Sequence, residues 1–468
     1  MEKLERLGLF DEFAMRGRWH LPQESPSDAV PGELKFSTSG IELKLDETFK
    51  IHATPSAFEQ VLRLDIPKAP TVWGTTVTRE KVTLRRAFIS SIGDDCEIVA
   101  NEFIVGAHVD DDNLGNVISA EIEFTHLEEW AYVPQFRMEE SEDKLRARLS
   151  YPAKPLKVLR VDDSLPFKNL TISADVRGHF RRTAIEFKAH TELIVEFAEP
   201  KSITNARTAL DRLTGLLSLL VGESVYPKRI HLTVQADSER HTIGMFMSLR
   251  RRSTRLEYAH QMTFPLALIH KEAPDIFRAW LAYEEKLRPV YNLVLSTVQA
   301  PDQYVQSIFL SLAQALESFH RIIYASEYEN VNTYVLVRRA LINAIPADIS
   351  PTLATKLRTM LKYGNQFSLR DRLHGLFDAL GIELSNAFLG SEKRTDFISK
   401  IVEIRNHLTH YDPSSPRSIV ELAGSTIEMH NLNQRLRALT TALLLKNVGM
   451  PDGPLGSLFQ PQHLHLAH

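Results

Sequence analysis

A group of polar side chains with catalytic potential lies near the C-terminal end of the sequence. Arg405, Asn406, His407 and His410 fall within six consecutive positions at the end of residues 393–411, where apolar residues recur with helical spacing. Histidine can transfer protons near neutral pH, arginine binds phosphate oxygens with a fixed positive charge, and asparagine can orient either group by hydrogen bonding. These residue types together could bind a phosphate group and transfer a proton. A helix C-terminus also attracts cations, so the same side chains could equally serve only to cap and solvate the helix end.

Helical geometry divides this group between two faces. Residues four apart differ by about 40° around a helix, so Asn406 and His410 share one face and Arg405 lies beside them. His407 is turned about 160° from Arg405, which favours a packing or capping role for it. The positions expected to face the interior form a separate apolar stripe of Phe397, Ile401, Ile404 and Leu408.

Length and composition limit the classes of protein to consider. A chain of 468 residues predicts two or three domains, and 43% hydrophobic with 24% charged residues is typical of a globular protein. The formal net charge is only −4, so any nucleic-acid site must be local. The single cysteine, Cys96, excludes an intrachain disulfide framework. The sequence shows no secretory signal and no membrane-spanning stretch, so we expect a cytoplasmic protein.

Hydrophobic periodicity changes along the chain and predicts an α+β protein. Up to about residue 200, apolar and polar residues alternate in short segments, as in "GELKFSTSGIELKLD", "VISAEIEFT" and "TELIVEFAE", which indicates antiparallel strands. Residues 205–222 have helical spacing and a short strand, "RIHLTVQAD", follows. Beyond residue 265 the pattern is almost wholly helical, with helices predicted over residues 274–298, 303–326, 332–344, 351–363, 368–380, 393–411 and 417–447.

These patterns predict four regions. They are a β-rich antiparallel domain over residues 1–200, a mixed connecting segment over 201–264, an all-α bundle over 265–450 and a disordered tail over 451–468. The predicted fold class is thus a β-rich antiparallel domain followed by a helix bundle.

Three other clusters favour structural interpretations over functional ones. "HVDDDN" at 108–113 could bind a hard cation, but acids between two strands usually form a solvated turn. "SLRRRSTR" at 248–255 could hold an RNA backbone, or be a solvated basic face. His463, His465 and His468 could chelate a metal, although a disordered tail without a metal site is the simpler interpretation. We expect neither a cofactor nor a metal site, and no nucleotide-hydrolysing motif is present.

The sequence around residue 405 resembles a known family. Arg405 and His410 match the RxxxxH signature of HEPN domains, and the signature lies in the penultimate long helix of a predicted bundle, as that family requires. Several further segments are similar to the ApeA-like branch of HEPN proteins: "FLSLAQALESFHRIIY", "SLRDRLHGLFDAL", "PDIFRAWLAYEEKLRPV" and, in the β-rich part, "GRWHLPQ" and "VPGELKF". The resemblance covers nearly the whole chain.

The resemblance implies a function. It implies metal-independent RNA cleavage in a bacterial anti-phage or abortive-infection setting, at an active site formed where two HEPN domains meet in a homodimer or a higher even oligomer. RNA would be the partner, a phage component would be the trigger, and the β-rich domain would be sensing or regulatory. The rival interpretation is a non-catalytic HEPN module that binds a ligand or assembles.

The same comparison suggests roles for individual residues. RNA supplies its own nucleophile, the 2′-OH, so an enzyme need only move protons and stabilise the crowded phosphate. His410 can act as general base or acid, Arg405 can bind phosphate oxygens, and Asn406 can orient the phosphate or the histidine. Glu317 and His407 are auxiliary candidates. Glu317 could orient Arg405 across the bundle, although a buried ion-pair partner is its simpler role.

Overall fold

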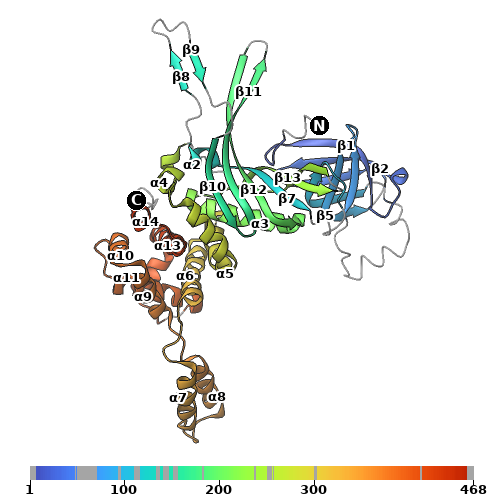
Figure 1. Ribbon diagram of the computed structural model, residues 1–468. Coiled ribbons are helices and arrows are strands. Elements are labelled where there is room, and N and C mark those ends of the chain that lie inside the picture. Colours follow the sequence, from blue (N-terminus) through green and yellow to red (C-terminus); the bar gives the residue numbers. More distant parts are fainter. Residues whose placement is uncertain are drawn as a thin grey trace. The chain divides into compact units, whose positions relative to one another are not determined.

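The computed structural model describes residues 7–47, 49, 71–92, 96–109, 116–132, 137–140, 147–150, 156–181, 184–236, 239–249, 256, 258–299, 303–411 and 414–460. The chain divides into two compact units, Met1–Ala282 and Tyr283–His468. The first unit is β-rich and the second is helical (Figure 1). The predicted fold class is therefore confirmed.

The β-rich unit is built on one antiparallel sheet of twelve strands. In spatial order these are β10-β11-β12-β7-β13-β14-β6-β3-β2-β1-β4-β5. In chain order they are β1 (Phe13–His20), β2 (Val30–Ser37), β3 (Gly40–Leu45), β4 (Val72–Thr76), β5 (Lys81–Ile92), β6 (Cys96–Val105), β7 (Val117–Phe124), β10 (Leu156–Ser164), β11 (Phe167–Arg181), β12 (Ala184–Lys201), β13 (Pro227–Ala236) and β14 (Glu239–Met247). A separate hairpin pairs β8 (Arg137–Glu140) with β9 (Ala147–Ser150).

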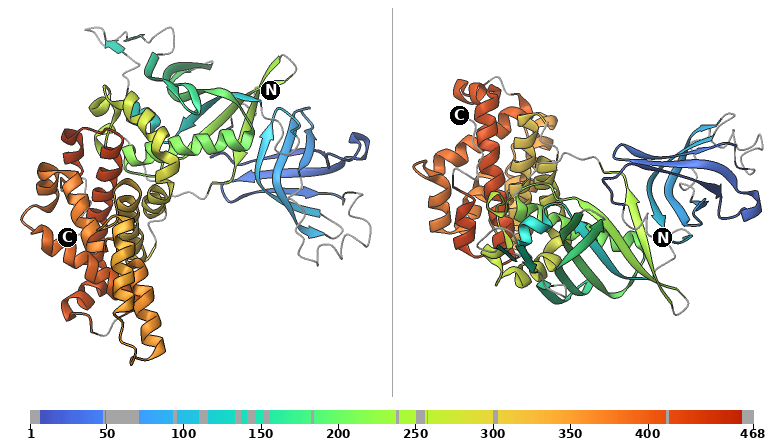
Figure 2. Two further views of the ribbon diagram at one scale, coloured as in Figure 1. Left: turned by 60° about the horizontal axis from the view of Figure 1, so that its bottom comes forward. Right: turned by 90° about the horizontal axis from the view of Figure 1, so that it is seen from above.

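Six of these strands close into a barrel. β6 pairs with β3 along one edge and with β5 along the other, so β6-β3-β2-β1-β4-β5 forms a ring, drawn in blue to cyan in Figure 2. Alternate residues fill its interior, and Trp19 is fully buried there. Gly74 of β4 makes room for that indole, because a Cβ at this position would lie 2.2 Å from the Trp19 ring.

The barrel joins the rest of the sheet through β6. Residues Glu102–Val105 of β6 pair with Met247–Gly244 of β14, so the sheet continues from the barrel into the other strands. The helix α3 (Ile203–Val221) is tied to the barrel by a buried ion network. Glu102, which is 1% exposed, forms an ion pair with Arg85 Nη1 at 2.9 Å and accepts a hydrogen bond from Arg207 Nη1 at 2.6 Å. Two cations thus compensate one buried carboxylate.

The residues predicted to form a connecting segment, 201–264, are instead part of this unit. They supply α3, β13 and β14, and both strands lie in the middle of the twelve-stranded sheet. The short strand of the prediction corresponds to β13, whereas β14 was not predicted. The first four residues of β14, Glu239 to Thr242, are polar and exposed. This part of the strand therefore lacks the alternation of apolar and polar residues from which the other strands were predicted.

The second unit is a helix bundle. After α2 (Leu127–Ala131) and α4 (Leu266–Ile269) in the first unit, α5 (Ala273–Gln299) spans the boundary. The remaining helices are α6 (Val305–Ile323), α7 (Val331–Asn343), α8 (Pro351–Tyr363), α9 (Leu369–Leu380), α10 (Ile382–Leu389), α11 (Arg394–His410), α12 (Arg417–Gly424), α13 (Thr426–Asn447) and α14 (Asp452–Ser457). The central helices α6, α9, α11 and α13 bury apolar stripes that include Phe309, Leu316, Phe377, Ile401, Leu436 and Leu443.

Two predictions for the C-terminal part of the chain were wrong in detail. The helix predicted over residues 417–447 is broken at Ser425, whose side chain accepts a hydrogen bond from the Glu428 backbone N–H at 3.3 Å and so starts α13 as an N-cap. The tail after Pro451, predicted to be disordered, begins with α14, and Leu455 and Phe459 are buried there. Residues 461–468, including the three tail histidines, lie outside the described residues.

A close contact between α6 and α9 gives a stability prediction. Helix propensity alone would make Gly375→Ala stabilising by about 1 kcal/mol. However, a Cβ at Gly375 would lie 2.8 Å from Nε2 of His320, which is only 4% exposed and packs beside Tyr324 and Phe367. We therefore expect Gly375→Ala to lower the free energy of unfolding of the helical unit by about 1–3 kcal/mol, measured by denaturant unfolding.

Gly424, at the end of α12, is the matched control, because a Cβ there would meet nothing within 4 Å. Gly424→Ala should be neutral or slightly stabilising. Equal effects of the two substitutions would show that the ring of His320 yields at no cost and would contradict the packing argument.

Candidate functional site

α11 places the candidate catalytic group at its C-terminal end. Phe397, Ile401, Ile404 and Leu408 are all buried, and the helix packs against α6, α9 and α12. The helix ends at His410, since Tyr411 adopts a left-handed conformation with φ of 48°. The Asp-Pro pair expected to stop the helix, residues 412–413, lies outside the described residues. Packing thus buries one side of α11, whereas Asn406, Thr409 and His410 are exposed.

Arg405, Asn406 and His410 lie away from the apolar stripe. Arg405 is partly exposed, whereas Asn406 and His410 are exposed. Arg405 Nη1 donates a hydrogen bond to Asn406 Oδ1 at 3.3 Å. The structure therefore joins two of the three predicted catalytic residues directly and places the third, His410, on the next turn of the same helix. All three side chains therefore reach solvent, Arg405 least of the three.

His407 has different surroundings. It is partly buried, its Nδ1 lies 3.1 Å from Ser415 Oγ, and its ring packs edge-on at 6.0 Å from the ring of Tyr411. These contacts connect the end of α11 to the segment that precedes α12. They support the packing role expected for His407 and leave its auxiliary catalytic role a prediction.

Glu317 lies on α6 and pairs along its own helix. Its carboxylate accepts a hydrogen bond from Arg321 Nη2 at 3.0 Å, and its side chain is 25% exposed. This is the ion-pair role considered for it, although the side chain is not fully buried. An orienting role towards Arg405 stays a prediction.

Sequence reasoning missed a buried arginine near this pair. Arg372 of α9 is 1% exposed, and its Nη1 donates to Ser326 Oγ at 2.7 Å. Burial lowers the pKa of this guanidinium, and the positive charge of Arg321 lowers it further, whereas Glu317 acts in the opposite direction. The burial of Arg372 could have been indicated by the sequence, because this arginine lies on the apolar side of the predicted helix 368–380.

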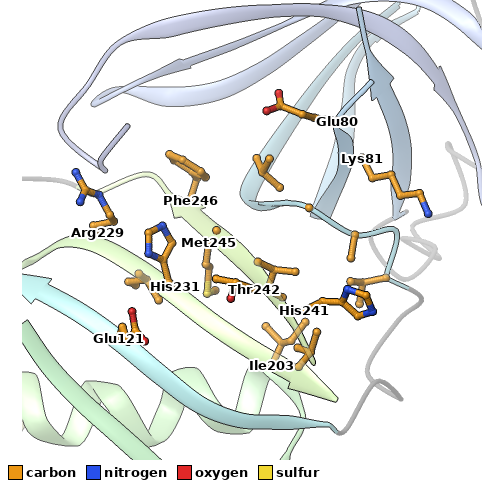
Figure 3. Close-up of a pocket in the computed structure, with 18 of the residues that line it drawn as sticks. Glu80, Lys81, Glu121, Ile203, Arg229, His231, His241, Thr242, Met245 and Phe246 are labelled. Carbon is orange, nitrogen blue, oxygen red and sulfur yellow. The ribbon is translucent and has the colours of Figure 1, made fainter. Parts of the chain in front are cut away.

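The β-rich unit contains a large cavity, which Figure 3 shows in close-up. Its volume is about 1180 Å³. Lys81 at the start of the barrel strand β5 and the preceding Glu80 lie on one side of it, and Arg229, His231 and Glu121 of β13 and β7 lie on the other. Arg229 pairs with Glu123 at 2.7 Å, and His231 lies opposite Glu121 in the strand register. The lining therefore combines charged side chains of both signs with apolar ones such as Met245 and Phe246.

The remaining clusters from the sequence fall largely outside the described residues. In "HVDDDN", His108 is described: its Nε2 lies 2.8 Å from the carbonyl oxygen of Gly74, and its ring stacks on Trp73. Residues 110–113 and the arginine run 250–255 are not described. Within the described ranges, no group of three or more potential ligands has the geometry of a metal site.

Among the residues that the structure describes, no helix combines the length and the apolar character needed to cross a bilayer.

Comparisons with known proteins agree with the architecture. The family model for ApeA N-terminal domain 1 matches residues 14–280, and that for the Apea-like HEPN domain matches residues 310–454. No curated protein and no solved structure matches the chain. The two matched regions account for the β-rich unit and for most of the bundle, including α11. The chain therefore belongs to the ApeA-like HEPN family, with an ApeA N-terminal domain followed by an Apea-like HEPN domain.

Proposed function

We propose that this protein is a metal-independent endoribonuclease of a bacterial anti-phage or abortive-infection system and acts in the cytoplasm. The observation that carries the proposal is the exposed group of Arg405, Asn406 and His410 at the end of α11, within a HEPN domain of the ApeA type. Its substrate would be RNA, with tRNA as one candidate.

The chemistry follows from these three side chains. A base removes the proton from the 2′-OH, the 2′-oxygen attacks the adjacent phosphorus, and the 5′-oxygen leaves with a proton from an acid. His410 would move one of these protons. Arg405 would bind the non-bridging oxygens as negative charge accumulates on them, and its hydrogen bond to Asn406 limits where the guanidinium can point. The products are a 2′,3′-cyclic phosphate and a 5′-OH.

One chain supplies only part of this apparatus. His410 and Asn406 are exposed, so water would screen their interaction with a phosphate in the isolated chain. A second copy against the end of α11 would exclude water and bring a second imidazole, so that one histidine could act as base and the other as acid. We therefore propose a composite site in a homodimer or higher even oligomer.

The experiment that tests the proposal is incubation of the purified protein with total cellular RNA in EDTA, followed by end-group analysis. Because the substrate carries its own nucleophile, we expect cleavage to survive chelation and to leave 2′,3′-cyclic phosphate and 5′-OH ends. Activity lost in EDTA and restored by a divalent ion, with 5′-phosphate ends, would contradict the proposed chemistry.

Subunit mixing tests the composite site. Intact chains are mixed with a roughly ninefold excess of His410→Ala chains, and the subunits are allowed to exchange. Only about one dimer in a hundred then contains two intact chains. Activity per intact chain should then fall about tenfold. Unchanged activity per intact chain would show that each chain cleaves alone. A matched mixture with Lys35→Ala, an exposed substitution in the β-rich unit, controls for dilution.

The β-rich unit would regulate this activity. Its cavity of about 1180 Å³ is large enough for a small ligand or a peptide segment derived from a phage trigger, and its lining offers both charges. The rival proposal, a non-catalytic HEPN module that binds a ligand or assembles, predicts no RNA cleavage even when a dimer forms.

A further inference from the structure

The helices α7 and α8 form an arm that stands apart from the rest of the bundle. Figure 1 shows the pair extending away from α6, α9 and α11 of the same unit. α7 has no buried residue, and Ala354 is the one buried residue of α8. Each helix has 13 residues and is therefore roughly 20 Å long. The pair therefore adds little to the hydrophobic core of the helical unit, so any function must lie on its surface.

The base of the arm is held by specific contacts. The two connecting segments pair through a bridge between Glu327 and Gln366 and through the Phe367 N–H bond to the Ser326 carbonyl at 2.9 Å. Asn365, which is 7% exposed, accepts from the Glu329 N–H at 2.9 Å and donates to the Glu329 carbonyl at 2.8 Å. These contacts hold the arm in a defined direction.

The helices contact one another through a single row from each. Tyr334, Arg338 and Ile342 of α7 and Ala354, Leu357 and Leu361 of α8 are the less exposed positions, and the Tyr334 hydroxyl donates to the Leu361 carbonyl at 2.6 Å. That contact joins the start of α7 to the end of α8, so the helices are antiparallel. Both helices are right-handed and they run antiparallel, so the residues that directly follow the contact positions in sequence lie on the same flank of the pair in both helices. The residues that directly precede the contact positions lie on the opposite flank.

The two flanks differ in chemistry. The first flank carries Arg339 of α7 together with Arg358 and Lys362 of α8. The opposite flank carries one cation and four exposed apolar side chains, namely Lys356, Val337, Leu341, Leu353 and Met360. The cations therefore gather on one side of the arm.

Charge distinguishes the arm from the rest of the molecule. Residues 330–364 contain five Lys or Arg and one acid, Asp348, so they carry a formal charge of +4 within a chain of net −4. Arg339, Arg358 and Lys362 are exposed, and no ion pair joins them to a carboxylate in the part of the chain that the structure describes. Exposed arginines elsewhere are often paired, as Arg417 is with Glu421. The flank is thus an uncompensated positive surface that suits a polyanion.

We propose that the flank of Arg339, Arg358 and Lys362 binds the phosphate backbone of the RNA that the α11 site cleaves. The proposal rests on the ribonuclease function proposed above, because it takes RNA as the ligand. Arg358 and Lys362 lie one turn apart on α8, so both can contact one strand, while Arg339 extends the surface across to α7. A second copy of the arm is a poorer occupant for this flank, because two surfaces of like charge repel.

The test measures binding of a fluorescent single-stranded RNA oligomer to the full-length His410→Ala protein, in which the RNA stays intact. In that background, the triple variant Arg339→Ala/Arg358→Ala/Lys362→Ala should bind RNA roughly tenfold to a hundredfold more weakly at about 0.15 M salt. The slope of log K against log salt should fall by about 2, at roughly 0.7 for each lost phosphate contact. The melting temperature should not change, since the three side chains are exposed.

A matched pair of single variants tests the location of the surface. Lys362→Ala and Lys356→Ala remove the same charge from the same helix but on opposite flanks, so only Lys362→Ala should weaken RNA binding measurably. Equal losses in the two, an unchanged salt slope in the triple variant, or absence of RNA binding by the parent would overturn the proposal. So would light scattering that shows the triple variant losing self-association while it keeps RNA affinity.

These outcomes are separable from those for the ribonuclease proposal. If the arm substitutions weaken RNA binding but the protein with His410 intact cleaves no RNA, the ribonuclease proposal fails, and the flank is an RNA-binding surface without a cleavage site. If cleavage proceeds and the arm substitutions leave RNA affinity unchanged, the arm proposal fails alone.

Discussion

Replacing His410 by Ala should lower the rate of RNA cleavage by about a hundredfold or more, the scale expected for losing a positioned general acid or base. His410 is exposed at the end of α11 and lies one turn from Asn406, whereas the core contacts of this helix come from other residues. The substitution should therefore leave the melting temperature nearly unchanged. The measurement is single-turnover cleavage of an RNA substrate alongside thermal unfolding.

His407→Ala is the matched control, because it removes an imidazole from the same helix three residues earlier. Its side chain contacts Ser415 and Tyr411 and is partly buried, so its loss should reduce stability more than turnover. An inactive His407→Ala protein and an active His410→Ala protein would reverse the assignment of the catalytic face.

Much of the fold could be predicted because its periodic signals are strong. The alternation in residues 32–46 gave the β2–β3 hairpin, and the stripe Phe397, Ile401, Ile404 and Leu408 gave the buried side of α11. Barrel closure could not be predicted, since it depends on β6 pairing with both β3 and β5, and neither pairing leaves a signature in one strand. The break at Ser425 was missed because helical spacing continues across it.

The arm shows a second limit of periodicity. Residues 331–343 and 351–363 have the spacing of ordinary helices, so the sequence predicts them as members of the bundle. Only the structure shows that their apolar side chains, such as Leu336 at 65% and Met360 at 60%, are exposed. Within the candidate site, the positions of Arg405, Asn406 and His410 on α11 followed from helix geometry. The burial of Arg372 did not, because it depends on Ser326 and on the base of the arm.

The 2′-hydroxyl of the substrate should be indispensable. In the proposed reaction it is the nucleophile, held next to the phosphorus within the same molecule, and intramolecular placement of this kind is worth several powers of ten in rate. A substrate with 2′-deoxy or 2′-O-methyl nucleotides throughout should therefore be cleaved more slowly by on the order of a thousandfold or more. It should bind with similar affinity, because Arg405 and the arm would contact phosphates, which are unchanged.

The most direct test of the ribonuclease account compares an RNA oligomer with its 2′-O-methyl counterpart under single-turnover conditions in EDTA, with the parent protein and with the His410→Ala variant. The account predicts fast cleavage only when the parent protein acts on the RNA oligomer. Cleavage should be very slow for the parent with the 2′-O-methyl oligomer and for the His410→Ala variant with either oligomer. Cleavage of the 2′-O-methyl oligomer by the parent at a rate near that of RNA would contradict the account, because the attacking oxygen would then have to come from water.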